Sequence, residues 1–237
     1  GRNDSNPVWS PLGDALALER SRGDGKEIVV VRLNGEIVQT IHHKAQAAPG
    51  KNPFFFPGVV EQTSYNSGIS WAQDGKRFVF MSNGGEGNYD IYLRELGGKT
   101  TTRLTDHREK DGQAHWSPVN DAIVFVSGRT GKGDIYVMDL RTRALTRLTQ
   151  GGKAYLYPQW SPDGKRLAFM AGSNENHDIF VIDDLTRPKE SLRQLTFGKT
   201  DELRPVWSPD GKALAFYTNQ NPEGDLRRWS IAVVPVE

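Results

Sequence analysis

Short apolar runs recur along the chain, and turn-forming residues bound each of them. A run such as RFVFMS or RLAFMA is followed by a loop rich in Gly, Asn and Ser, and then by a second run such as GDIYVMDL. Runs of this length that are rich in Val, Ile, Phe and Tyr predict β-strands. Their apolar residues are continuous rather than alternating, which indicates strands covered on both faces. No segment shows helical periodicity.

A tryptophan-centred box marks each repeat of this pattern. The five boxes are PVWSPLGD at 7–14, ISWAQDGK at 69–76, AHWSPVND at 114–121, PQWSPDGK at 158–165 and PVWSPDGK at 205–212. Their tryptophans are 62, 45, 44 and 47 residues apart. The last three spacings are close to the roughly 40–45 residues of a four-stranded propeller blade. The sequence therefore predicts an all-β protein, a β-propeller of four-stranded antiparallel blades with five repeats visible.

The repeats also predict the domain organisation. We expect one propeller domain over 1–237, with blade units at about 7–41, 69–105, 114–149, 158–196 and 205–237 and an insertion at 42–67. Four units supply four strands each and the last supplies three. A closed propeller completes its final blade with a strand from elsewhere, so we expect a sixth blade or a closing strand upstream; the alternative is a five-bladed ring that closes imperfectly.

The residues that recur among the repeats have structural explanations within the repeat itself. Pro-Asp-Gly is turn chemistry, because Pro presets its φ and Gly tolerates a positive φ. A tryptophan in every repeat supplies a large apolar group between neighbouring sheets. We expect the aspartates that precede the third strands, Asp90, Asp134 and Asp178, to bond local backbone or turn groups. The repeated residues therefore indicate scaffold rather than site.

Composition narrows the classes of partner. The chain has 30 Lys and Arg against 29 Asp and Glu, a formal net charge of +1, so it carries no broad basic surface of the kind that binds nucleic acid. No apolar run reaches 18 residues, which predicts no membrane span. The absence of cysteine excludes disulfides and thiolate metal sites.

The motifs W-S-P-D-G-K, L-A-F, D-I-Y-V-M-D and R-L-T, in that order, resemble the TolB-type propeller repeat. The resemblance covers nearly all of the chain except 42–67. TolB-like periplasmic proteins, the propeller domains of prolyl-oligopeptidase-type peptidases and oligogalacturonate lyases all carry this repeat, so the resemblance implies architecture more than function. It also implies a periplasmic or extracellular location. TolB has six blades and an α/β domain ahead of them, whereas this sequence shows five boxes and no such domain.

Strand direction predicts which end of the blades can bind a partner. Tight turns join the first strand to the second at one end, while longer, variable loops such as 106–113 and 197–204 emerge at the other. The residues just before each tryptophan are expected to enter the central channel. These channel residues are Gln113, His115, Tyr157, Gln159, Arg204 and Val206, and the loops leading to them add Arg108, Asp111, Tyr155, Asp201 and Glu202. Such a funnel suits a peptide or protein, and the alternative is a solvated channel without a ligand.

The insertion 42–67 contains a second candidate surface. Phe54, Phe55 and Phe56 lie between two prolines and must be covered, either by folding over the blade edge or by a partner for which they act as an exposed anchor. The adjacent His42 and His43 lack a third ligand at a fixed spacing, which favours surface residues over a metal site.

Neither a cofactor nor a metal is required by these patterns. The alternative is a Ca²⁺ ion in the channel, held by oxygens of Asp106, Asp111 and Asp201, although no D-x-D-x-D-G loop supports it.

The sequence contains no G-x-S-x-G, H-E-x-x-H or P-loop motif, and we assign no catalytic residue. We therefore expect a monomeric, non-catalytic binding propeller that recognises a protein or peptide. One alternative is the propeller domain of a larger prolyl-oligopeptidase-type peptidase. The other is an oligogalacturonate-lyase-like enzyme, which is disfavoured because His115 is the only histidine placed to line the channel.

Overall fold

The computed structural model describes residues 3–22, 25–42, 66–84, 88–150, 152–172, 176–219 and 229–237. Every regular element in these ranges is a β-strand, 19 in all, and none of the described residues is helical. The chain divides into two compact units, Gly1–Trp116 and Ser117–Glu237. The all-β fold predicted from the sequence is confirmed, while the expectation of a single domain stays a prediction.

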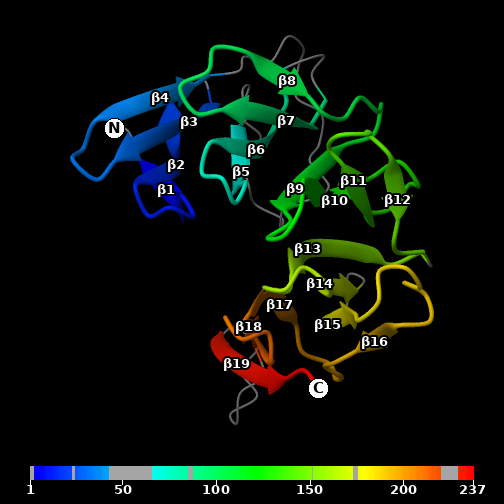
Figure 1. Ribbon diagram of the computed structural model, residues 1–237. Coiled ribbons are helices and arrows are strands. Elements are labelled where there is room, and N and C mark those ends of the chain that lie inside the picture. Colours follow the sequence, from blue (N-terminus) through cyan, green and yellow to red (C-terminus); the bar gives the residue numbers. More distant parts are fainter. Residues whose placement is uncertain are drawn as a thin grey trace. The chain divides into compact units, whose positions relative to one another are not determined.

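The first unit is made of two four-stranded antiparallel sheets and one further strand. Its strands are β1 (Asp4–Trp9), β2 (Ala15–Arg22), β3 (Gly25–Arg32), β4 (Ile37–Ile41), β5 (Asn66–Trp71), β6 (Arg77–Ser82), β7 (Asp90–Glu95), β8 (Thr101–Arg103) and β9 (Asp111–Trp116). The sheets have the orders β1-β2-β3-β4 and β5-β6-β7-β8, so strands adjacent in the chain are adjacent in space (Figure 1). Strand β9 packs against β5, β6 and β7.

The second unit repeats this arrangement. Its strands are β10 (Ala122–Ser127), β11 (Asp134–Asp139), β12 (Leu145–Arg147), β13 (Ala154–Trp160), β14 (Leu167–Gly172), β15 (His177–Ile182), β16 (Leu192–Gln194), β17 (Glu202–Trp207), β18 (Ala213–Thr218) and β19 (Ser230–Pro235). Strands β10, β11 and β12 pair in sequence, β13 to β16 form a four-stranded sheet, and β17 to β19 form a three-stranded one.

Second strands of the repeats form the core, as their continuous apolar runs predict. All six residues of β10 and of β14 are buried. In β14 the Phe169 ring lies 5.8 Å from Tyr155 at an angle of 74° and stacks on Phe180 at 6.1 Å. Side chains on both faces of β14 are inaccessible to solvent because other strands pack against each face. Such strands are stable only when repeats stand next to each other.

Two tryptophans of the boxes form hydrogen bonds with the preceding repeat. The indole N–H of Trp207 donates to the carbonyl oxygen of Gln159 at 3.2 Å, and the Arg166 guanidinium lies 4.8 Å from the centre of the same indole. In the first unit, the indole N–H of Trp71 donates to the carbonyl of Val8 at 3.4 Å. These contacts use both the apolar ring and its polar N–H. The structural interpretation of the box is consistent with this geometry.

The turn glycines of the boxes also pack against the preceding repeat. Gly164 has φ +68°, and a Cβ atom at this position would lie 2.3 Å from Cγ2 of Val119. Gly75 has φ +63°, and its Cβ would lie 2.7 Å from Cγ of Leu12. Two features favour glycine at each of these positions: the left-handed backbone and the neighbouring side chain that a Cβ atom would meet.

The last sheet departs from the predicted two-sided burial. Strand β18 alternates between buried and more exposed residues, and Tyr217 is 49% exposed. In β19, Ile231 and Val233 are 71% and 65% exposed. The expectation that all apolar runs are covered on both faces is wrong for this sheet, because within the second unit only the preceding sheet packs against it.

Replacing Phe169 by Ala is expected to lower the free energy of unfolding by about 3–5 kcal/mol, because the side chain is fully buried and its loss leaves a cavity. The matched control is Phe197→Ala, since Phe197 is 76% exposed, and it should change stability by no more than about 0.5 kcal/mol. Urea unfolding followed by tryptophan fluorescence measures both. Equal effects of the two substitutions would contradict the assigned core.

Candidate binding site

A left-handed residue occurs three positions before every tryptophan of the boxes. The five residues and their φ angles are Asn6 (+49°), Gly68 (+66°), Gln113 (+53°), Tyr157 (+53°) and Arg204 (+53°). Strand pairing shifts register around four of them, between Ser5 and Val8, Ser67 and Ser70, Leu156 and Gln159, and Leu203 and Val206. These four first strands therefore contain a β-bulge, which bends the strand and redirects side chains. Sequence reasoning missed these bulges; the glycine at 68 was the available signal.

Residues other than glycine are strained in this backbone geometry. A positive φ is uncommon for residues other than glycine, and a sparsely populated conformation of this kind costs on the order of 1–3 kcal/mol. Because the conformation recurs in all five boxes, the repeat fold itself imposes it. The bulge places whichever residue occupies the position at the same point of each inner strand. Variation at this position changes the exposed chemistry without changing the scaffold.

The bulges of the fourth and fifth repeats bring two predicted site residues together. The Arg204 guanidinium lies 4.9 Å from the centre of the Tyr157 ring, and its Nη2 donates to the Tyr157 hydroxyl at 3.4 Å. Arg204 is exposed and Tyr157 is half-buried. Val206, two residues further along β17, is 58% exposed. The contact between Arg204 and Tyr157 therefore joins a cation of β17 to an aromatic ring of β13.

Two other predicted site residues of the second unit have structural contacts. Tyr155 is buried, and its hydroxyl donates to the carbonyl of Gln150 at 2.9 Å; burial raises the pKa of this hydroxyl. Gln159 is half-buried and accepts the indole N–H of Trp207 through its carbonyl. Direct contact of these two residues with a partner stays a prediction.

The predicted site residues of the first unit differ in accessibility. Arg108 has a side chain 88% exposed and lies 3.7 Å from a carboxylate oxygen of Glu109. Asp111 is fully buried at the start of β9, while Gln113 and His115 on the same strand are half-buried. Burial lowers the pKa of His115 to about 4, so this imidazole is neutral at pH 7.

The carboxylates considered for Ca²⁺ each have other surroundings. Asp106 is an ion-pair partner of Arg103 at 3.0 Å, and Asp201 contacts Nδ1 of His177 at 3.0 Å. Among the described residues, no group of three or more His, Cys, Asp or Glu side chains is arranged to hold a metal ion. Calcium binding stays a prediction. Phe54, Phe55 and Phe56, together with His43, lie outside the described residues.

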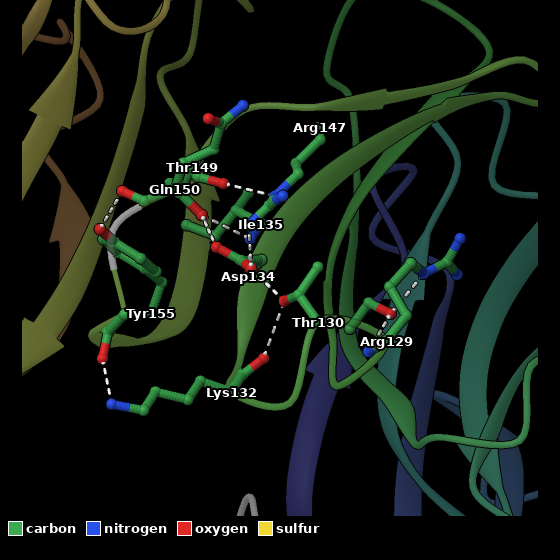
Figure 2. A network of polar contacts seen from close by, with 11 residues as sticks. Arg129, Thr130, Lys132, Asp134, Ile135, Arg147, Thr149, Gln150 and Tyr155 are labelled. Atoms are coloured by element: carbon green, nitrogen blue, oxygen red, sulfur yellow. Dashed lines mark hydrogen bonds and ion pairs between the residues drawn. The ribbon is translucent and has the colours of Figure 1, made fainter.

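Asp134 at the start of β11 has one partner in the preceding turn, as expected, and further partners that were not expected. Asp134 accepts hydrogen bonds from the side chains of Thr130, Thr149 (3.0 Å) and Arg147 (2.8 Å), and Figure 2 shows this network. The Thr149 hydroxyl also accepts the backbone N–H of Ile135 at 2.9 Å. The partners are thus mainly side chains of the fourth strand and the residues just after it. Strand pairing brings them near, which the local sequence around each Asp does not reveal.

Comparison with known protein families identifies the fold to which this arrangement of strands belongs. The sequence profile of the TolB beta propeller domain matches residues 57–233. The chain belongs to this family. The β-propeller fold predicted from the repeats is thereby confirmed. A search among curated proteins found no match.

Solved structures with this fold are similar to the chain over nearly its whole length. A crystal structure of TolB from Acinetobacter baumannii is 22% identical with a TM-score of 0.71, and the match covers 98% of this chain and 52% of that one. A putative TolB from Agrobacterium tumefaciens is 21% identical with a TM-score of 0.71, covering 99% and 77%. This TolB-type propeller therefore spans about half the length of the Acinetobacter protein.

A peptidase, which is not a TolB protein, is also similar to this chain in structure. A puromycin-hydrolysing peptidase from Mycobacterium tuberculosis is 17% identical with a TM-score of 0.70, and the match covers 99% of this chain and 36% of that one. At these identities the likeness shows the fold alone. No helix able to cross a membrane occurs in the described parts of the TolB-type propeller.

Replacing Gly68 by Ala is expected to destabilise the protein by about 1 kcal/mol. The space around a Cβ atom at this position is open, so the cost comes from the left-handed backbone alone. Gly68→Asn should cost less, because Asn tolerates this conformation and occupies the matching position in the first repeat. Urea denaturation of both variants tests the bulge, and a loss for Asn as large as that for Ala would contradict the φ argument.

Stability should depend on pH through His115. Its folded-state pKa of about 4 lies below the ordinary 6.5, so the unfolded chain binds the proton more tightly. The stabilisation is present above pH 6.5 and is lost as the pH falls toward 4, by on the order of 2–3 kcal/mol. Denaturant unfolding between pH 4 and 7.5 should show a shallower pH dependence for His115→Gln than for the wild type. Parallel curves would contradict the assigned pKa.

Proposed function

We propose that this TolB-type propeller is a non-catalytic binding domain that recognises a protein or peptide partner. The observation that carries the proposal is the contact between Arg204 and Tyr157 on two strained bulges of neighbouring repeats. The bulges turn these side chains out of the strand ladders, whereas Trp71 and Trp207 of the boxes join neighbouring repeats. The binding surface is then β13 and β17 rather than the repeated box.

The chemistry of this surface suits a partner that carries a carboxylate. Arg204 is exposed, and among the described residues it has no acidic partner: its recorded contacts are with Tyr157. A guanidinium stacked on a ring keeps its remaining N–H groups available and loses little freedom when they bind a carboxylate. Arg and Tyr are also enriched among the residues that dominate protein interfaces. We infer that an acidic side chain or a chain terminus of the partner docks at Arg204.

Features of both the sequence and the structure support a binding rather than a catalytic role. No nucleophile, metalloprotease or phosphate-binding motif is present in the sequence. His115 is neutral at pH 7 and half-buried in β9, which gives it little use as a surface acid. We propose further that the protein acts as a monomer in the periplasm or outside the cell, by resemblance to TolB-like proteins.

A second candidate function is the propeller domain of a larger peptidase. The similarity to the mycobacterial peptidase favours it, because the match uses almost all of this chain but about a third of that protein. In that case a hydrolase domain belongs to the same polypeptide. Intact-mass measurement of the endogenous protein, followed by peptide mapping, distinguishes the two functions.

The binding proposal is tested with purified protein as bait in a periplasmic extract. Captured proteins are identified by mass spectrometry, and the best-enriched one is purified for a titration by biolayer interferometry. Arg204→Glu should weaken binding at least about tenfold, because it removes the stacked cation and places a negative charge opposite the partner's carboxylate. Tyr157→Ala should weaken binding less, since the cation stays but loses its support.

The matched control for this titration is Arg141→Glu, which makes the same charge change in the exposed turn between β11 and β12. It should bind as the wild type does. Equal affinities of the wild type and Arg204→Glu would overturn the assignment of the surface. Equal losses for Arg204→Glu and Arg141→Glu would show a general charge effect instead of a site.

A further inference from the structure

A buried carboxylate occurs at each joint between repeats for which the structure gives the contacts, and in three cases a cation neutralises it. The three ion pairs are Glu19 with Lys26 at 2.9 Å, Asp90 with Arg103 at 2.6 Å, and Asp134 with Arg147 at 2.8 Å (Figure 2). A buried ion needs such a partner, because an isolated charge is strongly disfavoured away from water. The pattern thus sets an expectation for the joint between the fourth and fifth repeats.

Among the described residues, that joint has no such cation bonded to its carboxylate. Asp178 occupies the position of Asp90 and Asp134, but Gln194 replaces the arginine that follows in the fourth strand. The Gln194 amide donates to the carbonyl of Thr196 at 2.8 Å and leaves Asp178 unneutralised. In place of a cation, Glu202 of β17 brings a second carboxyl group. Asp178 and Glu202 are 9% and 3% exposed.

Neutral donors surround the two carboxyl groups. Asp178 accepts the Thr196 hydroxyl at 3.4 Å and the Asn176 amide at 3.3 Å. One oxygen of Glu202, Oε1, accepts the hydroxyls of Thr200 and Thr218 at 2.8 and 3.1 Å. The other, Oε2, is buried and no donor among the described residues reaches it.

The backbone N–H of His177 donates to Asp201 at 3.0 Å, which brings the neighbouring residues Asp178 and Glu202 close together, and the charge of Asp178 raises the pKa of Glu202. A carboxylate accepts hydrogen bonds and donates none, so a direct bond between two carboxyl groups requires a proton on one of them. Oε2 of Glu202, which no donor among the described residues reaches, is the atom suited to carry it. Paired buried carboxyl groups behave in this way because two like charges in contact do not both ionise readily.

We propose that Asp178 and Glu202 share one proton at neutral pH, and that this makes the joint between the fourth and fifth repeats a pH-sensitive device. Loss of the proton to solvent leaves two negative charges in contact between β15 and β17. Their repulsion then weakens the packing of β17 on the fourth repeat. The proton takes the place that arginine or lysine holds at the other joints.

The other charged groups around the pair are either exposed or engaged with partners of their own. Lys153, ahead of β13, favours the charged form of Asp178, but it is exposed and its ammonium lies over the Phe180 ring at 4.9 Å. His177 on β15 and Asp201 ahead of β17 are engaged with each other.

The remaining neighbouring strands add no charge to the pair. On β16, Arg193 is bonded to Asp183 at 2.5 Å. Strand β14 has no titratable residue, and on β18 the phenol of Tyr217 is half exposed. Burial is the largest cause that raises the pKa of both Asp178 and Glu202, and the charge of Asp178 raises that of Glu202 further.

The sign of the pH dependence follows from these raised values. A group whose pKa is higher in the folded state stabilises the fold below its ordinary pKa, here 3.8 for Asp178 and 4.5 for Glu202. That stabilisation is lost as the pH rises through the folded-state pKa. The joint is therefore tightest in acid and looser toward alkaline pH. Arg204 follows Glu202 by two residues on β17, so the loosened strand is the one that carries the proposed binding residue. The device itself does not depend on the binding proposal.

The experiment combines carboxyl NMR with thermal unfolding of the full chain. In protein labelled with ¹³C at glutamate carboxyl groups, one resonance, assigned by its absence in Glu202→Gln, should titrate well above the ordinary pKa. Between pH 4.5 and 8.5, the Tm of the wild type should fall relative to that of Glu202→Gln by about 3–5 °C for each pKa unit of elevation. Groups such as His115 act alike in both proteins, so the difference isolates the pair.

Two further variants keep the outcome decisive. Gln194→Arg should remove most of the same pH dependence, because the guanidinium then neutralises Asp178 as Arg147 neutralises Asp134; this variant serves even if Glu202→Gln folds poorly. Glu190→Gln, in an exposed loop, should keep the wild-type pH dependence.

Two results would overturn the proposal. The first is titration of the Glu202 carboxyl at the ordinary value, with parallel Tm curves for the wild type and Glu202→Gln. The second is a rise in the Tm of the wild type, but not of Glu202→Gln, on addition of millimolar CaCl₂ at pH 7.5. That result would show that the pair holds a metal cation and not a proton.

Discussion

Burial of apolar side chains on both faces of the second strands is the constraint on which the structure depends. A strand such as β14, with all six residues buried, cannot be stable in an isolated sheet, because one of its faces would meet water. Each repeat therefore needs a neighbour, and the contacts between repeats become as important as the pairing within them. Trp71 and Trp207, the turn glycines Gly75 and Gly164, and Arg166 on the Trp207 indole make such contacts.

Close packing of repeats brings polar groups into the joints, and the chain satisfies them with a recurring arrangement. A buried carboxylate accepts a threonine hydroxyl, which in turn accepts a backbone N–H, and an arginine neutralises the charge. In the fourth repeat this arrangement loses its arginine and gains Glu202. Two differences, Gln194 in place of an arginine and Glu202 at the start of β17, leave a carboxyl pair where Asp134 has an ion pair. The irregular member of a repeat is thus where a property beyond architecture arises.

The same separation of scaffold and function holds for the inner strands. The bulge before each tryptophan is imposed by the fold, but the residue that occupies it varies from Gly68 to Tyr157 and Arg204. A position with fixed backbone and variable side chain is suited to carry specificity, since substitutions there leave the packing of the repeats unchanged. Membership of the TolB propeller family accounts for the fold of the chain, and the contact between Arg204 and Tyr157 on β17 and β13 is the basis of the proposed binding surface.

Much of the architecture follows from sequence alone, because it rests on local turn chemistry and on the period of the apolar runs. The five boxes, the 19 strands and their antiparallel order all follow from these signals. Contacts between residues far apart in sequence required the tertiary structure. Arg204 and Tyr157 are 47 residues apart, and Asp178 meets Glu202 from the next repeat, so no local pattern reveals either pair. Two-sided burial of β18 was wrongly expected for the same reason: a strand's sequence records what it can bury, and only the packing of its neighbours decides what is buried.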